Sequence, residues 1–385
     1  MMMGGRRAYT GGIVPRVVQV GVSRYTRRLP ARGDPLAFLV SMHVEGTATS
    51  WQRNVTLTPA LEAQLLEWID GMRRWSGGMG LTRATAREAV VSTGAALRDT
   101  FLGTEGTEVL AGLSPTAILW GIDETVIHLP WEMTTGADDT PLLRTPLGRI
   151  VASRILPQRS RDMDTEDPKV RILVVDVPSD GLAESDREVE AINGFASLGG
   201  GPEVEIVTLS RGEATRDAFR AAVRGQDFDI VHFAGHGRFD SRYPGDVSIV
   251  LADGPFDDEA VLGLEWSRPP FVVVNSSCES GRAAPGRRIV TAGKASNGLA
   301  AAFLARGVEA YLGHYFPVPD TSAAEFAQAF YGSLINTTNI GTAVQHARMR
   351  LMRAYESDAV DLTAFGATFF GDAGTAERYD VAMAA

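Results

Sequence analysis

The sequence has a single cysteine, Cys278, among its 385 residues, so no disulfide can form within the chain. A chain with only a free thiol is typical of a reducing compartment. Long apolar runs are also missing, because the longest match a strand or a short helix and fall well below the ~20 residues that span a bilayer. The opening segment, MMMGGRRAYTGG, is charged and lacks the apolar stretch of a secretory signal. We therefore expect a cytoplasmic protein with no membrane partner.

Positive charge is in deficit as well. The chain has 37 Lys and Arg against 47 Asp and Glu, which gives a net charge of −10. This balance disfavours direct nucleic-acid binding and favours solubility. Hydrophobic residues make up 44% and charged residues 22%, as in ordinary globular proteins, so a disordered or collagen-like chain is excluded. At ~100–200 residues per domain, the length predicts two domains or one large α/β unit.

Arginine is concentrated at the start of the chain. Residues 1–32 contain seven arginines and no acid, interrupted by glycines and prolines. We expect residues 1–36 to form a loosely attached basic arm, and docking of this arm onto an acidic surface is the alternative. The next region, 37–160, has the patterns of a strand at 37–44, helices at 59–75 and 84–101, and short strands at 116–120 and 125–129.

The polar and acidic segment 161–169 (RDMDTEDPK) is the best candidate for a linker between domains. After it, strands and helices alternate through 170–375, and residues 376–385 remain as a tail. Alternation of this kind predicts a mostly parallel sheet flanked by helices. We expect strands at 170–177, 204–209, 228–233, 247–251, 271–275 and 308–312, and helices at 184–198, 213–224, 297–306, 321–335 and 340–355.

Two strand ends in this region carry reactive side chains. Sites in parallel sheets form at the carboxyl ends of strands; His236 follows one expected strand (DIVHFAGHG) and Cys278 follows another (VVVNSSCESG). A thiol needs a nearby base to become a nucleophilic thiolate, and imidazole suits this task near neutral pH. The backbone N–H groups of Gly237 and Cys278 are then candidate donors to a tetrahedral oxyanion. On these residues alone, an inert and buried Cys278 is an equally good interpretation.

A metal site formed by His232 and His236 is a weaker hypothesis. On a strand, residues four apart are separated by about 13 Å at ~3.3 Å per residue, and Gly235 disfavours a helix there. We therefore expect His232 to be a buried strand histidine with local hydrogen bonds.

Motifs around the two strand ends follow one another in a fixed order. HFAGHG is followed about forty residues later by SSCESG, then by NGLAAAFLARG and by PVPD at 317–320. LADG, AFYGSL and FFGD accompany them, and LPWEM (129–133) and PLLRTPLGRIVASR (141–154) precede them. Together these motifs resemble the CHAT peptidase domain, a caspase-like family related to separases, over about residues 80–375. The resemblance implies a caspase-like, mostly parallel sheet, with a non-catalytic caspase-like half at 37–160 and the catalytic CHAT domain at 170–375.

The resemblance also implies an activity. Carried over to this sequence, it makes Cys278 the nucleophile, His236 the general acid and base, and Gly237 and Cys278 the oxyanion donors. It implies a cysteine endopeptidase that forms an acyl-enzyme intermediate and uses neither a metal nor another cofactor.

Candidate substrate-pocket residues surround the dyad: Ser276, Ser277, His314, Phe316 and Asp320. Phe316 stands where relatives often have Trp, which affects the shape of the pocket. Asp320 fits a helix N-cap as well as a substrate contact. Ser276 stands where relatives that cut after Arg or Lys, such as metacaspases, have Asp. We therefore expect an apolar or small residue before the cut.

The resemblance implies a protein substrate, such as a pore-forming or other defence effector encoded nearby, that is cut during antiviral defence or regulated cell death. It also leaves room for an activating partner. A catalytically silent CHAT module that binds a partner is the alternative, which the presence of both His236 and Cys278 opposes.

Overall fold

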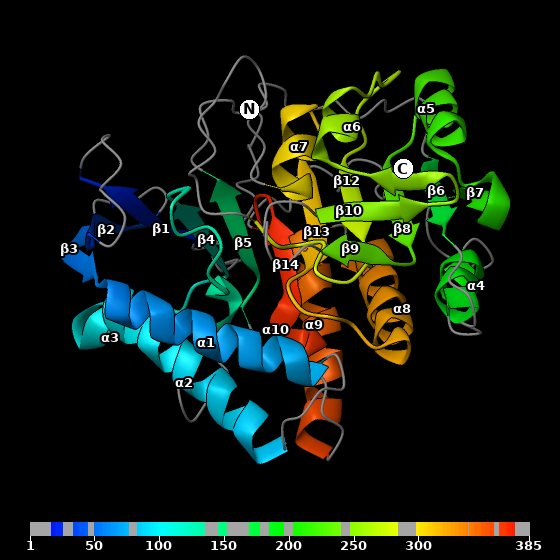
Figure 1. The fold of residues 1–385 in the computed structure, drawn as a ribbon. Coiled ribbons are helices and arrows are strands. Elements are labelled where there is room, and N and C mark those ends of the chain that lie inside the picture. The colour runs from blue at the N-terminus through cyan, green and yellow to red at the C-terminus, as the bar shows by residue number, and fades with distance from the viewer. Residues whose placement is uncertain are drawn as a thin grey trace, which may run out of the picture.

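The computed structural model places one large mixed sheet at the centre of the molecule (Figure 1). It describes residues 17–25, 34–44, 50–76, 83–134, 145–151, 169–177, 185–195, 203–239, 247–283, 298–337, 339–357 and 362–373. The sheet has 11 strands in the order β3-β2-β1-β4-β5-β14-β13-β12-β8-β6-β7. They are β1 (Val17–Arg24), β2 (Leu36–Val44), β3 (Ser50–Leu57), β4 (Ala117–Ile122), β5 (Leu147–Val151), β6 (Val170–Asp176), β7 (Val204–Ser210), β8 (Ile230–Ala234), β12 (Val272–Asn275), β13 (Ala310–His314) and β14 (Ala367–Phe370). A small sheet has the order β11-β10-β9, from β9 (Gly237–Phe239), β10 (Val247–Leu251) and β11 (Gly254–Phe256).

Helices flank the large sheet. They are α1 (Pro59–Ser76), α2 (Arg83–Phe101), α3 (Gly103–Leu113), α4 (Ser185–Phe195), α5 (Arg216–Gly225), α6 (Asp258–Leu262), α7 (Leu299–Ala305), α8 (Asp320–Thr337), α9 (Ile340–Ser357) and α10 (Thr363–Gly366), with 3-10 helices η1 (Trp131–Met133) and η2 (Arg211–Glu213). In Figure 1, α1, α2 and α3 lie below the N-terminal strands, and α8 and α9 lie below the C-terminal ones. Among the helices of the described segments, none has the length and apolar character needed to cross a bilayer.

The strands from β13 to β7 run parallel to one another. Their cores, such as VVVN in β12, are β-branched and buried, which is typical of parallel strands covered on both faces. Phe233 of β8 packs on Phe219 of α5, whereas its neighbour His232 faces Tyr331 of α8. Because successive side chains of a strand point to opposite faces, helices cover both sides of the sheet here, as the alternating sequence pattern predicts.

The N-terminal strands include one that the sequence patterns did not predict. Residues 17–24 fall within the arm expected at 1–36, yet they form β1, which lies between β2 and β4. Its valines, Val18, Val20 and Val22, are buried. The interpretation as an arm was therefore wrong for this stretch, because arginine content obscured the period-2 alternation of VVQVGV. Residues 1–16 and 26–33 of the expected arm, most of the expected linker and the expected tail lie outside the described residues.

The expected strand at 125–129 is a series of turns instead. The carboxylate of Asp123 accepts hydrogen bonds from the backbone N–H of Thr125 (3.0 Å) and from its hydroxyl (2.6 Å). The indole of Trp131 donates to the carbonyl of Val126 at 3.0 Å. These local bonds satisfy groups that a strand would leave for a neighbour, so the apolar run folds inward as a turn.

Buried charges lie where the N-terminal and C-terminal strands meet, at the β5–β14 pair. Arg149 of β5 donates through both Nε (2.7 Å) and Nη2 to the carboxylate of Glu132, and both side chains are 1% exposed. Arg348 of α9 donates to the carbonyls of Ala364 (2.9 Å) and Glu132 (3.4 Å). Burial lowers the pKa of Arg348 to about 10. The LPWEM and PLGRIV motifs thus meet in one polar core between the two parts of the sheet.

Candidate active site

The two predicted reactive residues follow neighbouring strands. β8 and β12 are adjacent and parallel, with Phe233 opposite Asn275. His236 and Cys278 each come three residues after this register pair. The N–H of Ser276 still donates to the carbonyl of Phe233 at 3.0 Å, so the pairing continues into the first residue of the cysteine loop. Both loops therefore leave the same edge of the sheet side by side.

Gly237 brings the two loops into contact. A β-carbon at this position would lie 2.4 Å from the carbonyl oxygen of Cys278 and 3.2 Å from Oγ of Ser277. Gly235 has φ +142°, and a β-carbon there would lie 2.6 Å from the carbonyl oxygen of Val177. His236, between these glycines, is exposed at the rim of the loop. The glycines of HFAGHG are thus needed because backbone passes close to backbone on either side of the histidine.

The Cys278 thiol is partly buried, and its Sγ accepts a hydrogen bond from the N–H of Val318 at 3.4 Å. Burial raises the pKa of this thiol, and the negative charges of Glu279 and Asp320 raise the pKa further, while the hydrogen bond from Val318 partly opposes them. The resting thiol is therefore protonated at neutral pH. A separate base is needed to make it a nucleophile.

Glu279, directly after the cysteine, has a left-handed backbone with φ +57°. Its carboxylate is held by Arg73 of α1 and by Arg282 in the same loop. Sequence patterns did not single it out, because a glutamate carries no signal for left-handed backbone, unlike glycine or asparagine. This residue connects the cysteine loop to the N-terminal part of the chain.

Four of the five pocket candidates are buried: Ser276 and Ser277 at the start of the cysteine loop, and His314 and Phe316, whose carbonyls accept N–H groups of that loop. The hydroxyl of Ser277 donates to the side-chain oxygen of Asn275, and the carbonyl of Phe316 accepts the N–H of Glu279 at 3.4 Å. The backbone N–H of His314 donates to Oγ of Ser280 at 3.0 Å. In this structure these four residues support the loop.

Asp320 is the fifth candidate and is partly exposed, close enough to Cys278 for its charge to raise the pKa of the thiol. It is the first residue of α8. The carbonyl of Pro319, one residue earlier, accepts the first helical bonds, from Ser322 and Ala323. Pro319 therefore takes the N-cap position expected for Asp320, and Asp320 lies in the first turn, where an acid suits the helix dipole.

A buried polar network lies behind the cysteine strand. His232 has both ring nitrogens engaged, Nδ1 with the hydroxyl of Tyr331 and Nε2 with the carboxylate of Glu188, each at 3.0 Å. The hydroxyl of Ser276 donates to the same carboxylate at 2.5 Å. The expectation that His232 is buried is confirmed, but its hydrogen-bond partners are 99 and 44 positions away along the chain instead of local. Glu188 of α4 was missed, because a lone helical acid is usually a solvated one.

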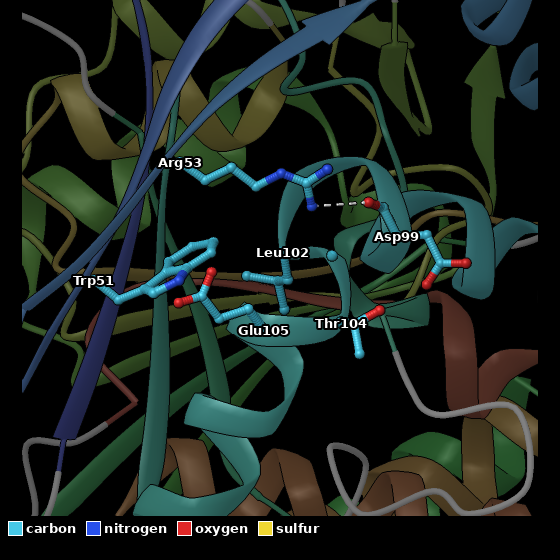
Figure 2. Close-up of a pocket in the computed structure, with 7 residues that line it drawn as sticks. Trp51, Arg53, Asp99, Leu102, Thr104 and Glu105 are labelled. Atoms are coloured by element: carbon cyan, nitrogen blue, oxygen red, sulfur yellow. Dashed lines mark hydrogen bonds between the residues drawn. The ribbon is translucent and has the colours of Figure 1, made fainter.

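A hollow of about 440 Å³ lies elsewhere, between β3 and the start of α3 (Figure 2). It is lined by Trp51, Arg53, Asp99, Leu102, Gly103, Thr104 and Glu105. Within it, Nη1 of Arg53 donates to the carbonyl of Asp99 at 3.2 Å, as Figure 2 shows. None of the residues expected at the active site lines this hollow, so it is separate from the dyad.

The sequence matches the CHAT domain family over residues 91–372. The chain belongs to this family. No curated protein matches the chain. Among solved structures, a chain of the Saccharomyces cerevisiae separase–securin complex at 3.0 Å resolution superposes with a TM-score of 0.56 at 10% identity and covers 93% of this chain. A second structure of that complex, at 2.6 Å, gives a TM-score of 0.53 at 10% identity and 92% coverage.

These likenesses show that the CHAT protein has the caspase-like fold of separase. In both superpositions the aligned part is 30% of the solved chain from the separase–securin complex. The CHAT protein therefore spans about a third of the length of that solved chain. The family and the fold are those of caspase-like proteases. At such low identity the structural likeness shows the fold alone, so the activity has to be argued from the site.

Proposed function

We propose that this CHAT protein is a cysteine endopeptidase in which Cys278 is the nucleophile and His236 the general acid and base. The observation that carries the proposal is the contact between Gly237 and Cys278, which holds the histidine and cysteine loops against each other at the ends of adjacent parallel strands. The match to a caspase-like protease family supports it.

The reaction begins when the imidazole of His236 takes the proton from Sγ of Cys278. The thiolate then attacks the carbonyl carbon of the substrate peptide and forms a tetrahedral oxyanion. As the C–N bond breaks, His236 returns its proton to the leaving amine, which leaves an acyl-enzyme thioester. Water attacks this thioester with His236 again as base, and the acid product and the free thiol are released.

Backbone N–H groups supply the oxyanion hole of this proposal. The N–H of Val250 donates to the carbonyl of His236 at 3.1 Å, which extends the β9–β10 ladder by one residue and puts His236 opposite Val250. Gly237 is therefore a non-hydrogen-bonded position opposite Ile249, and its N–H points away from β10. Gly237 also contacts Cys278, so its N–H and that of Cys278 are suitable donors to one oxyanion.

The chain division that we propose follows from where these groups lie. Residues 170–375 carry both members of the dyad and form the catalytic domain, and residues 37–160 together with β1 (Val17–Arg24) form a non-catalytic half that supports it. Asp320, the partly exposed pocket candidate, is the first residue to test for contact with substrate.

The substrate is a protein, which we place in bacterial defence or regulated cell death, with a pore-forming or other effector encoded nearby as the first candidate. The CHAT family and the relation to separase, which was solved bound to securin, support a protein as partner. An activating partner is part of this proposal, because burial raises the pKa of the resting Cys278 thiol.

Co-expression with candidate effectors, read by immunoblot and mass spectrometry, tests the proposal. We expect wild type to cut one of them, and Cys278→Ala and His236→Ala to leave it intact while remaining folded. His43→Ala, an exposed histidine on β2, is the matched control and should cut normally. Cleavage of the effector by Cys278→Ala would refute the assignment of Cys278 as the nucleophile. Stable binding of the effector without cleavage by wild type would favour a scaffold.

A further inference from the structure

The last turn of α1 reaches the cysteine loop. Arg73 of α1 makes a bidentate contact with Glu279, with Nε 2.5 Å from Oε1 and Nη2 3.2 Å from Oε2. Three residues later, Oγ of Ser76 donates to the carbonyl of Pro317 at 2.5 Å. Glu279 directly follows Cys278, and Pro317 directly precedes Val318, which donates to the thiol. One helical turn thus holds both segments that position the nucleophile.

Glu279 needs such support because of its backbone. The left-handed region is unfavourable for a non-glycine residue, and strained residues persist only where their surroundings hold them. The carboxylate of Glu279 is 6% exposed and lies between Arg73 and Arg282, the latter at 2.8 Å. Two charge-assisted contacts on one buried carboxylate offset the strain. They also fix the direction in which the chain leaves Cys278.

The helix that supplies Arg73 ends at Ser76, before the first residue of the family match at 91. In Figure 1, α1 runs from below the N-terminal strands towards α9 and α10. Arg282 comes from the cysteine loop itself and moves with it. Arg73 is therefore the contact through which the carboxylate of Glu279 is tied to an element outside the cysteine loop.

We propose that Arg73 is a positioning residue for Cys278, acting through Glu279, so that a helix outside the family match keeps the nucleophile in place. Its effect on turnover rests on the proposed peptidase function, whereas its effect on the loop does not. Arg73→Ala should lower kcat on the order of tenfold to a hundredfold and change KM less than twofold, because a misplaced nucleophile slows chemistry more than binding.

Two variants separate positioning from general structural damage. Arg73→Lys keeps one charged contact and should recover most of the lost kcat. Arg74→Ala is the matched control, because Arg74 is the next residue of α1, is 57% exposed and, within the described part of the chain, pairs only with its helix neighbour Asp70. Its kcat should stay within twofold of wild type.

A double-mutant cycle tests the route through Glu279. Glycine adopts a left-handed backbone without an anchor. If Arg73 acts by holding Glu279, then Arg73→Ala should change kcat less than twofold when added to Glu279→Gly. An equal loss of kcat in both backgrounds would overturn the proposal, as would an Arg73→Ala variant that behaves like Arg74→Ala.

Hydrogen exchange keeps the proposal testable if the peptidase function itself fails. Arg73→Ala should speed exchange of the amides from Glu279 to Arg282 and of Val318 by at least fivefold relative to Arg74→Ala. Unchanged exchange at these amides would refute the positioning role, whatever the activity of the chain. Faster exchange without any peptidase activity would refute the proposed function alone.

Discussion

The carbonyl oxygen of Cys278 faces the α-carbon of Gly237 so closely that a β-carbon there would lie 2.4 Å from it. Backbone cannot yield as a flexible side chain does, so a larger residue at 237 must push the histidine and cysteine loops apart. We expect Gly237→Ala to lower peptidase activity at least tenfold and to destabilise the fold by about 1–3 kcal/mol. Activity assays and denaturant unfolding measure the two effects. Gly112→Ala, a helical glycine with open space around it, should retain full activity and gain a few tenths to about 1 kcal/mol.

Alkylation of the single cysteine reports the state of the resting thiol. A thiolate that is already formed in the resting protein would react readily with iodoacetamide at mildly acidic pH. In the structure, burial raises the pKa of Cys278, and nearby carboxylates add to the rise. We therefore expect slow reaction of the folded chain at pH 6, below the rate of the unfolded chain, with an increase only above the ordinary thiol pKa of about 8.5. A folded rate at pH 6 well above the unfolded rate would show a stabilised thiolate instead.

His128 should make the stability of the protein depend on pH. Burial, the largest cause, lowers the pKa of this histidine to about 4 from its ordinary 6.5. Between these values the unfolded chain binds the proton and the folded chain does not. The stabilisation is therefore present above pH 6.5 and is lost as the pH falls towards 4. Between pH 7 and pH 5, wild type should lose about 2 kcal/mol of unfolding free energy more than His128→Gln does. Parallel pH profiles of the two proteins would contradict this expectation.

Glu132 compensates buried arginine charge. Its carboxylate is bound by Arg149, and its carbonyl accepts from Arg348. Glu132→Gln should cost about 3–5 kcal/mol, because it leaves a buried guanidinium without its counter-ion. Glu124→Gln is the matched control, since Glu124 is half exposed in a pair with Arg24 and should cost about 1 kcal/mol or less. Equal denaturation midpoints for the two variants would show that the buried pair is not important for stability.

Cleavage specificity should exclude a basic residue just before the cut. Ser276 supplies no carboxylate, and its hydroxyl is directed to Glu188 in the buried network. The carboxylate of Glu279 is already engaged by two arginines. A buried substrate cation would then lack a partner, at a cost of several kcal/mol. A peptide library should show selection for apolar or small residues. Strong selection of Arg or Lys that Asp320→Asn abolishes would assign the specificity pocket to Asp320.

Local pattern predicted most of the C-terminal half. The β-branched runs of β6, β8 and β12 are long enough and alternate with helices regularly enough that a parallel sheet was the expected result. It was the strand-end rule that pointed to His236 and Cys278. β1 was missed for a physical reason, because arginines around Val17–Arg24 concealed its alternation. The expected strand at 125–129 did not form because hydrogen bonds that the Asp123 carboxylate accepts from Thr125 competed with strand pairing.

What the sequence by itself determined was the set of elements and the order of the motifs, since both depend on neighbours along the chain. Only the tertiary structure decided which residues support Cys278. Arg73 and Glu279 are 206 positions apart, and Ser276 and Glu188 are 88 apart. No periodicity links such residues, because their contact depends on how α1 and α4 pack against the sheet. Burial, which raises the pKa of the thiol, likewise arises only when these distant segments come together.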